Sequence, residues 1–111
     1  MSIDAGSIVI VNFPGAKGIK RRPAIVISTN IYHTTRPDVI CSVITSQTAS
    51  ATAPSDYILQ DWSTAGLNKE SAFRAFIVTL PAQNILSIVG KVSNRDWKEI
   101  QKRLLLAVSI K

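Results

Sequence analysis

Short runs of apolar and β-branched residues recur along the chain up to residue 92. The runs are Ser7–Phe13, Pro23–Ser28, Val39–Thr45, Asp56–Gln60, Ser71–Leu80 and Ile85–Val92. Runs of this kind, rich in Val and Ile and bounded by Pro, Gly, Asn or Ser, are typical of β-strands. Five or six short strands at roughly even spacing predict a small barrel or sandwich.

Polar segments between these runs predict loops. Gly15–Arg22 carries four cations, and Pro23 then begins the second strand, where a missing N–H costs least. The other predicted loops are Thr29–Asp38, the uncharged Ser46–Ser55, and Asp61–Leu67. Within the last strand, Gly90 predicts a bulge.

The periodicity changes after the last strand. Ser93 and Asp96 form an S-x-x-D capping signal, and an apolar stripe on one helical face follows, made of Trp97, Ile100, Leu104 and Val108. A helix that covers one sheet needs one apolar face, yet Leu104–Leu106 adds side chains outside this stripe. Two interpretations stay open: the helix is buried deeply in its own domain, or, as we favour, it contacts a second copy in a homodimer.

The composition indicates one domain, residues 1–111, in a reducing compartment. A hydrophobic content of 46% supplies a core, and the lone Cys41 excludes an internal disulfide and a cysteine-cluster metal site. No apolar run has the length of a membrane span, and Met1–Gly6 lacks the basic start and apolar stretch of a signal peptide. We therefore expect a soluble, cytoplasmic protein without a cofactor.

Charge and histidine content narrow the chemistry. Thirteen Lys and Arg against seven Asp and Glu give a net charge of +6, which favours a polyanionic partner such as nucleic acid. His33 is the single histidine. A two-histidine acid–base pair is therefore excluded, and any histidine-dependent triad must use His33.

Three places carry polar residues suited to a site. They are the cationic loop with Arg22, the strand end Thr45-Ser46-Gln47, and Arg74, which stands alone in an apolar strand between Phe73 and Phe76. Arg74 needs a carboxylate, carbonyl groups or a ligand phosphate, so a structural salt bridge and a functional site both stay open. Arg22 is equally consistent with a solvated loop charge, and Thr45 and Ser46 with hydroxyls that cap a turn.

The order and spacing of six segments resemble the MazF/PemK family of bacterial toxins over about residues 6 to 110. The segments are G-S-I-V-I-V-N-F-P, K-R-R-P-A-I-V-I-S, D-V-I-C-S-V-I-T-S-Q, A-G-L-N-K-E-S-A-F-R, T-L-P and V-G-K-V-S, followed by the helix. The most specific parts are R-P-A-I-V-I-S and V-I-T-S-Q at their separation. The resemblance implies an SH3-like barrel of five to seven strands with a C-terminal helix.

The resemblance also implies a function. It implies a homodimeric toxin of a type II toxin–antitoxin system, a metal-independent endoribonuclease that cuts single-stranded RNA and is bound by a cognate antitoxin. Arg22 matches the family's catalytic arginine before proline, Thr45 its catalytic threonine, Ser46 the hydroxyl that follows in the PemK branch, and Arg74 a second catalytic arginine of that branch. For RNA binding we expect the cations Lys17, Lys20 and Arg21, together with Gln47, Phe76 and His33.

The expected chemistry is attack by the RNA's own 2′-OH, which gives 2′,3′-cyclic phosphate and 5′-OH ends. Two guanidinium groups suit the charge of the phosphorane. Both familiar carboxylates of the family are missing, because position 76 is Phe and the first loop has no acid. Arginine is a poor proton acceptor near neutral pH. The sequence therefore predicts a slow ribonuclease, or one with a base elsewhere, for which Asp56, Asp61 and Glu70 are equal candidates.

Two other functions stay open. The missing carboxylates favour a catalytically weak module that binds RNA or an antitoxin. A gyrase inhibitor of the CcdB kind shares the fold class, but that class depends on a Trp-Gly-Ile-like tail, and this chain ends in Val108-Ser109-Ile110-Lys111.

Overall fold

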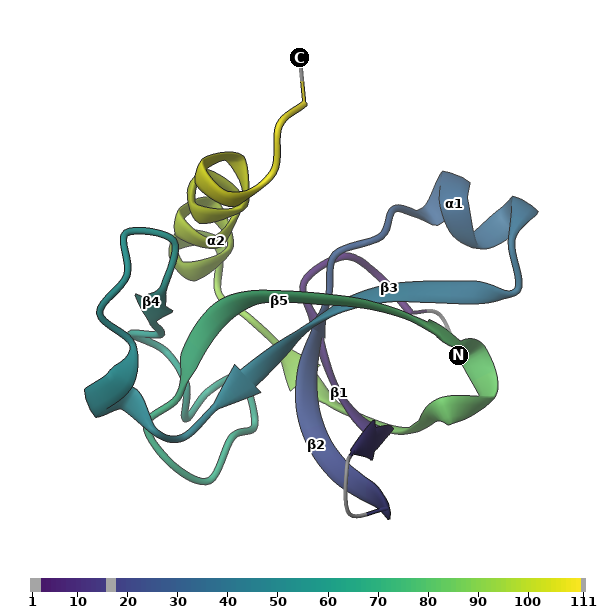
Figure 1. Ribbon diagram of the computed structural model, residues 1–111, viewed down its shortest axis with the longest axis horizontal. Helices are drawn as coiled ribbons and strands as arrows, with labels where there is room; N and C mark the ends of the chain where they lie inside the picture. The colour runs from purple at the N-terminus through teal and green to yellow at the C-terminus, as the bar shows by residue number, and fades with distance from the viewer. Residues whose placement is uncertain (1–2, 16–17, 111) are drawn as a thin grey trace.

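The computed structural model describes residues 3–15 and 18–110, whose strands form one curled, six-stranded sheet (Figure 1). The strands are β1 (Ser7–Gly15), β2 (Gly18–Val26), β3 (Asp38–Thr45), β4 (Tyr57–Ile58), β5 (Ala72–Pro81) and β6 (Ile85–Lys91). Their order is β4-β5-β3-β2-β1-β6, and every neighbouring pair is antiparallel. The predicted mainly β fold with a C-terminal helix is confirmed, with the sheet forming a half-barrel.

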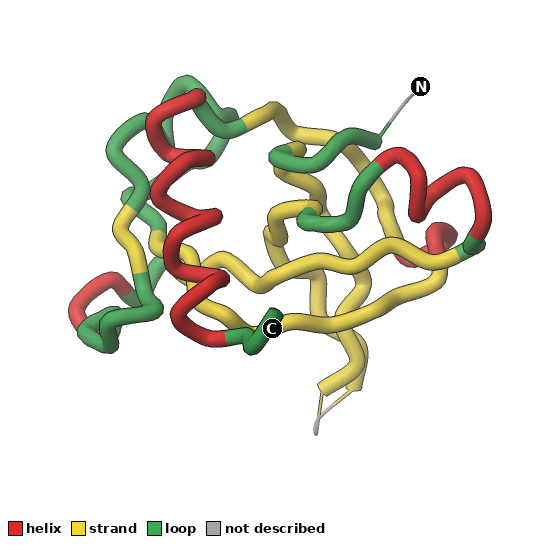
Figure 2. Tube along the Cα trace, turned by 90° about the horizontal axis from the view of Figure 1, so that it is seen from above, coloured by secondary structure: helices red, strands yellow, loops and turns green. Residues whose placement is uncertain are grey.

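Within the described ranges, three short helical segments connect strands, and a longer helix follows the last strand. They are α1 (Asn30–Thr35), α2 (Asn94–Ala107) and two single 3₁₀ turns, η1 (Thr48–Ser50) and η2 (Ala82–Asn84). Figure 2 shows α1 and α2 well apart. No helix in the described part of the chain is long and apolar enough to cross a membrane.

The two faces of the sheet bury separate cores. The inner core comprises Val9, Val11, Ala24, Val26, Val39, Cys41 and Leu80. The helix core comprises Ile8, Ile25, Ile44, Tyr57, Leu59, Ala65, Phe73, Val92 and Ile100, the last of them on α2. Strands with both faces buried read as continuous apolar runs, as Ser7–Phe13 does. Burial in the inner core raises the pKa of the Cys41 thiol to about 11, which makes that thiol unreactive.

The predicted cationic loop is wrong, because most of it is strand. β2 begins at Gly18 and pairs with β1 from Gly15 and Gly18 onward, so the hairpin is much tighter than expected. Pro23 therefore lies inside β2 and not at its start. Pro23 is tolerated because β2 pairs with β3 only from Ala24 onward, which leaves one side of Pro23 outside the ladder.

The predicted loop between the second and third strands contains a helix. Thr29 caps α1, since its hydroxyl accepts a hydrogen bond from the Tyr32 N–H at 3.3 Å. Thr34 and Thr35 then donate to the carbonyl of Ile31. The helical turn is rich in Thr and Ile, which have weak helix propensity, so side-chain hydrogen bonds and not periodicity define it.

The predicted bulge at Gly90 is confirmed, and Gly90 has a second role. The β1–β6 register shifts between the pairs Ile8–Gly90 and Val9–Ile88. A Cβ at position 90 would lie 2.2 Å from the carbonyl oxygen of Ala65. Only glycine therefore lets the turn before Leu67 pack directly against β6.

The capping signal at Ser93 is confirmed, with a different role for Asp96. The Ser93 hydroxyl accepts from the Asp96 N–H at 3.3 Å. The Asp96 carboxylate, fully buried, turns away from the helix and accepts from the Tyr57 hydroxyl at 2.6 Å and from the backbone N–H groups of Gln60 and Asp61 at 3.1 and 2.8 Å. Asp96 thereby joins the start of α2 to the segment that follows β4.

The apolar surplus of α2 is not buried in its own domain. Trp97, Ile100 and Leu104 pack against the helix core, as the stripe predicts. Leu105 and Leu106 are 62% and 65% exposed. The first of the two interpretations, deep burial within one chain, is therefore wrong for these two residues.

Asp61 makes the stability of the fold depend on pH in the acidic range. Hydrogen bonds from Arg95, at 2.7 Å to each carboxylate oxygen, and then from Ser93 lower the pKa of Asp61 to about 2. A carboxyl with a depressed folded pKa stabilises the fold above its unfolded pKa of about 3.9 and loses that contribution as pH falls.

We expect the stability difference between wild type and Asp61→Asn to shrink between about pH 4 and pH 2. Urea unfolding at a series of pH values measures this difference. A difference that stays constant down to pH 2 would contradict the assignment of the low pKa to Asp61.

Candidate active site

Strand register brings Arg22, Thr45 and Arg74 to one end of the sheet. Thr45 is the last residue of β3 and pairs with Ala72, the first residue of β5. Arg74 follows Ala72 by two residues along β5. On the other side of β3, pairing with β2 ends at Ala24 and Val43, and Arg22 and Thr45 each lie two residues beyond that pair. The predicted catalytic positions thus come from three neighbouring strands at the same end.

Arg22 and Lys20 point to the face of the sheet that covers the inner core. In the β1–β2 hairpin, Arg22 lies opposite Val11 and Lys20 lies opposite Phe13. Opposed residues of an antiparallel pair share a face, and Val11 is a fully buried member of the inner core. Both cations are themselves exposed. They therefore stand at the open end of the inner core.

The four expected cations do not form one cluster. Arg21 lies opposite Asn12, one residue out of phase with Arg22, so its side chain points to the other face of the hairpin. Lys17 lies outside the described residues. The expectation that Arg21 binds RNA beside Arg22 assumed a loop, but these residues lie on a strand and point to opposite faces.

A contact between Phe13 and Phe76 shows that the sheet curls over this end. Their ring centroids are 5.6 Å apart at an interplanar angle of 80°, an edge-to-face contact. Phe13 belongs to β1 and Phe76 to β5, with β2 and β3 between them in the sheet. The contact brings this part of β5, including Arg74, toward the face that carries Lys20 and Arg22.

Phe76 is an aromatic side chain open to solvent near this end. It is 55% exposed, whereas Phe73 and Tyr57 are buried in the helix core and Trp62 packs against that core. Phe76 is thus a ring supported by Phe13 that stays largely open to solvent, two residues from Arg74 on β5.

The end of β3 orients the Thr45 hydroxyl. The backbone N–H of Gln47 donates to the Thr45 hydroxyl oxygen at 3.1 Å. Because that oxygen is the acceptor, the hydroxyl proton is available for another group. Ser46 and Gln47 are exposed beside it.

Arg74 has both a salt bridge and an exposed end. Its Nε lies 3.9 Å from Oδ1 of Asp56, and its side chain is 52% exposed whereas that of Asp56 is 8% exposed. The buried Ser42 hydroxyl on β3 donates to the Arg74 carbonyl. The structure thus confirms the ion pair, and the exposed end of the Arg74 side chain stays open to solvent.

His33 is not brought to this end of the sheet. It lies on α1, where its Nε2 is 2.5 Å from the hydroxyl oxygen of Ser28, which also accepts from the Ile40 N–H. Ile40 is near the start of β3, about 17 Å along the strand from Thr45 at 3.4 Å per residue. The expectation that His33 binds RNA together with these residues is therefore not met within one chain.

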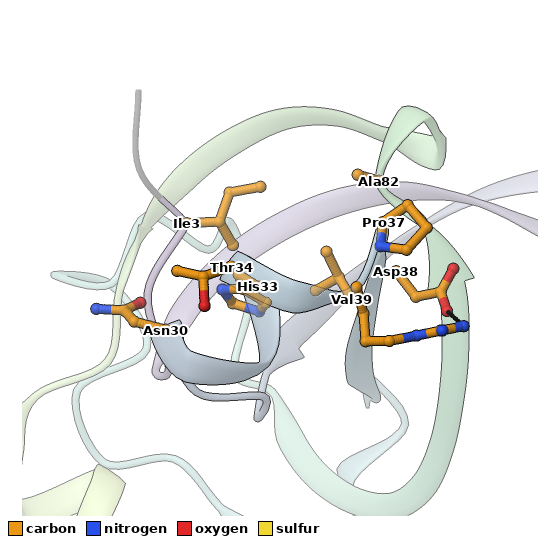
Figure 3. A pocket seen from close by; sticks show the side chains of 9 residues that line it. Ile3, Asn30, His33, Thr34, Pro37, Asp38, Val39 and Ala82 are labelled. Atoms are coloured by element: carbon orange, nitrogen blue, oxygen red, sulfur yellow. Dashed lines mark ion pairs between the residues drawn. The ribbon is translucent and has the colours of Figure 1, made fainter.

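His33 instead lines a pocket of about 450 Å³ between α1, the start of β3 and Ala82. Figure 3 shows His33 and Thr34 on the helix facing Ile3 and Val39. Arg36 and Asp38 also line the pocket and form an ion pair at 3.5 Å. Among the described residues no group of three or more His, Cys, Asp or Glu side chains is gathered as a metal site would require.

Of the residues at this end, Phe13 was missed from the sequence and Asp56 could not be singled out. Phe13 supports Phe76, and Asp56 pairs with Arg74. The alternation of β1 and β2 would place Phe13 beside Lys20 once the hairpin turn is known. Asp56 was one of three acids without a basis for choice, and only the register of β4 against β5 distinguishes it.

Comparisons with known proteins identify the family of this chain. The family model of PemK-like, MazF-like toxins of type II toxin–antitoxin systems matches residues 4–108. The chain is 35% identical over 92 residues to the endoribonucleases MazF2 of Mycobacterium bovis and MazF6 of Mycobacterium tuberculosis, covering 81% of this chain and 80% of each relative.

Solved structures show the same fold at lower identity. A mycobacterial endoribonuclease in complex with its cognate antitoxin superposes with a TM-score of 0.82 at 17% identity, covering 99% of this chain and 98% of that one. MazF in a MazE–MazF structure from Deinococcus radiodurans gives 0.74 at 20% identity, covering 97% and 96%. By its match over nearly the whole length, this chain belongs to the PemK-like, MazF-like toxins of type II toxin–antitoxin systems.

Proposed function

We propose that this toxin is an endoribonuclease that cuts single-stranded RNA through the RNA's own 2′-OH. The observation that carries the proposal is the convergence of Arg22, Thr45 and Arg74 from β2, β3 and β5 at one end of the sheet. The endoribonuclease names of relatives that are 35% identical support it.

The reaction needs charge stabilisation more than covalent chemistry from the protein. The 2′-oxygen forms a bond to phosphorus and the bond from phosphorus to the 5′-oxygen breaks. The 2′-OH gives up one proton and the 5′-oxygen gains one, which leaves 2′,3′-cyclic phosphate and 5′-OH ends. The phosphorane between these states carries extra negative charge on its equatorial oxygens, and preorganised cations stabilise such charge strongly in a partly dehydrated site.

Each residue has a role that its geometry supports. Arg22 and Arg74 bind the phosphorane oxygens with their planar, permanently charged guanidinium groups. The Thr45 hydroxyl, whose oxygen accepts from the Gln47 N–H, donates a hydrogen bond to the scissile phosphate. Ser46, exposed next to it, supplies a second hydroxyl to the phosphate.

Substrate binding uses the surroundings of this centre. Lys20, on the same face as Arg22, binds a neighbouring phosphate. Phe76, with Phe13 behind it, offers a face on which an unpaired base stacks. Gln47 lies beside Thr45 with its side chain exposed and contacts the RNA there. We leave Arg21 and His33 out of this surface. Arg21 points to the opposite face of the hairpin, and His33 lies near the start of β3, far from Thr45.

The proposal extends to the partners of the toxin. Related MazF structures contain MazE or a cognate antitoxin, and we propose that an antitoxin segment covers the same face of this chain. We further propose a homodimer. Leu105 and Leu106 in the last turn of α2 and Ile110 three residues beyond its end are exposed and support it, since exposed apolar patches commonly mark interfaces.

A second candidate is a toxin-fold module that binds RNA without efficient cleavage. Phe76 at the position of a family carboxylate is the observation that favours it. Such a module would bind single-stranded RNA and leave it intact.

We expect the purified chain to cut a long single-stranded RNA at discrete positions in the presence of EDTA. Cleavage should persist in EDTA because no metal ion takes part in the proposed steps. Mapping of the fragment ends should find 2′,3′-cyclic phosphate and 5′-OH groups, because the 2′-OH of the RNA is the attacking group. Sedimentation of the same sample should give the mass of a dimer. Intact RNA after incubation with a folded protein would favour the binding module, and cleavage that EDTA abolishes would contradict the proposed chemistry.

A further inference from the structure

Asp56 is the one carboxylate in the described part of the chain that lies within ion-pair distance of either arginine proposed for catalysis. It immediately precedes β4, in which Tyr57 pairs with Phe73 and Ile58 with Ala72. Continuing that register by one residue sets Asp56 opposite Arg74. Directly opposed side chains of an antiparallel pair share a face and interact, so the backbone itself places this carboxylate beside the guanidinium.

The Asp56 carboxylate is held in one orientation. Its Oδ2 accepts from the backbone N–H of Ala53 at 3.0 Å, which leaves Oδ1 facing Nε of Arg74 at 3.9 Å. Arg103 on α2 donates to the backbone carbonyls of Pro54 and Asp56 at 3.0 and 2.7 Å, and so fixes the segment from behind. A buried carboxylate on a segment held from α2 is a rigid partner for a long, flexible side chain.

The remaining acids near this end have other partners. Asp61 is bound by Arg95 and Ser93, and Glu70 accepts from the Thr48 hydroxyl at 3.1 Å. The structure thus distinguishes Asp56 from the two acids that the sequence could not separate from it.

We propose that Asp56 is a positioning residue for Arg74, an inference that rests on the ribonuclease function proposed above. Asp56 holds the Nε side of the guanidinium, and the exposed half of Arg74 presents its terminal nitrogens to the scissile phosphate. A flexible arginine side chain loses rotamer entropy when it is fixed, so an arginine oriented before substrate arrives binds the phosphorane at less cost. The carboxylate takes no proton in this role.

The first test is Asp56→Asn, which keeps the shape and an oxygen for the Ala53 N–H but removes the charge that faces Arg74. We expect kcat to fall about tenfold with KM changed less than twofold, because the lost interaction acts in the transition state. Asp38→Asn is the matched control, because it makes the same change at an acid that pairs with Arg36 at the start of β3, and it should keep kcat within twofold. An unchanged kcat in Asp56→Asn would overturn the proposal.

A double-mutant cycle separates positioning from other roles. If Asp56 acts through Arg74, Asp56→Asn has no further effect on kcat when Arg74 is already replaced by Ala. Single-turnover cleavage over long incubations measures these slow variants. The same tenfold loss in both backgrounds would show that Asp56 acts independently, as a base or as a general support of the fold, and would refute the assignment.

A measurement without RNA tests the contact between Asp56 and Arg74 separately from the proposed ribonuclease function. In ¹⁵N-labelled wild-type protein, we expect the Nε–H of Arg74 to show a clearly higher heteronuclear NOE than that of Arg21, which points to the other face of the hairpin. Asp56→Asn should lower the Arg74 value to that of Arg21. If the chain proves unable to cut RNA, the ribonuclease proposal fails while this comparison still tests the contact. Equal mobility of the two arginines in wild type would reject it.

Discussion

Replacement of Arg22 by Ala should lower kcat for RNA cleavage by about 100- to 1,000-fold, the usual cost of removing one preorganised donor to a developing anion. Arg22 stands on the face of the inner core, level with Thr45 across the end of the β2–β3 ladder. A neutral methyl group leaves part of the phosphorane charge without a partner. The measurement is single-turnover cleavage of an oligonucleotide that carries the mapped site.

Arg21→Ala is the matched control for Arg22→Ala. The two variants lose the same charge from adjacent positions of one strand, so the general attraction for RNA falls equally in both. Because Arg21 points to the opposite face, its removal should change kcat less than threefold. Equal losses in the two variants would mean that net charge alone matters and that β2 does not position a specific catalytic group.

The same pair of variants distinguishes two modes of action in cells, RNA cleavage and action on a protein target. If growth arrest results from RNA cleavage, Arg22→Ala should abolish it and Arg21→Ala should retain it. Arrest that persists in Arg22→Ala would favour an action on a protein target, as in the gyrase inhibitors of this fold class.

Replacement of Asp96 by Ala should lower the free energy of unfolding by about 3 to 5 kcal/mol, a large fraction of the stability of a small domain. The fully buried carboxylate accepts hydrogen bonds from Tyr57, Gln60 and Asp61. Alanine removes the shared acceptor of all three donors, of which the Tyr57 hydroxyl is buried, and the start of α2 loses its link to the segment after β4. Urea unfolding at one fixed protein concentration measures the loss, since any dimer would make stability depend on concentration.

Two milder variants calibrate the Asp96 result. Tyr57→Phe removes one of the three donors and should cost about 1 to 2 kcal/mol. Asp96→Asn keeps the shape and one acceptor oxygen, and should fall between Tyr57→Phe and Asp96→Ala. Burial and the adjacent Asp96 raise the pKa of Tyr57, so the phenol stays a donor throughout the useful pH range. A loss below 1 kcal/mol in Asp96→Ala would show that the network is dispensable.

Much of the fold could be predicted from local pattern, because its causes are local. Strand runs such as Val39–Thr45 are apolar on both faces, and Ser93 is a helix cap that acts within one turn. The errors have a physical cause as well. Lys20, Arg21 and Arg22 are polar residues of a strand that extends beyond the sheet's core, and polarity alone does not distinguish such a strand from a loop.

The candidate site was predicted as separate residues, and the family pattern supplied their roles. Arg22, Thr45 and Arg74 each stood out by neighbours in the sequence, such as the proline after Arg22 and the phenylalanines around Arg74. Sequence position offered no means of deciding between Asp56, Asp61 and Glu70, because the choice depends on which strand each acid lies beside.

The amino-acid sequence by itself determined the mainly β class, the closing helix, the family and the residue types available for phosphate chemistry. Tertiary structure alone decided which of those residues meet. The strand register pairs Asp56 with Arg74 and separates Arg21 from Arg22, and the curl of the sheet brings Phe13 of β1 to Phe76 of β5. These contacts join segments that are distant along the chain, and they exist because two apolar faces of one sheet must both be buried.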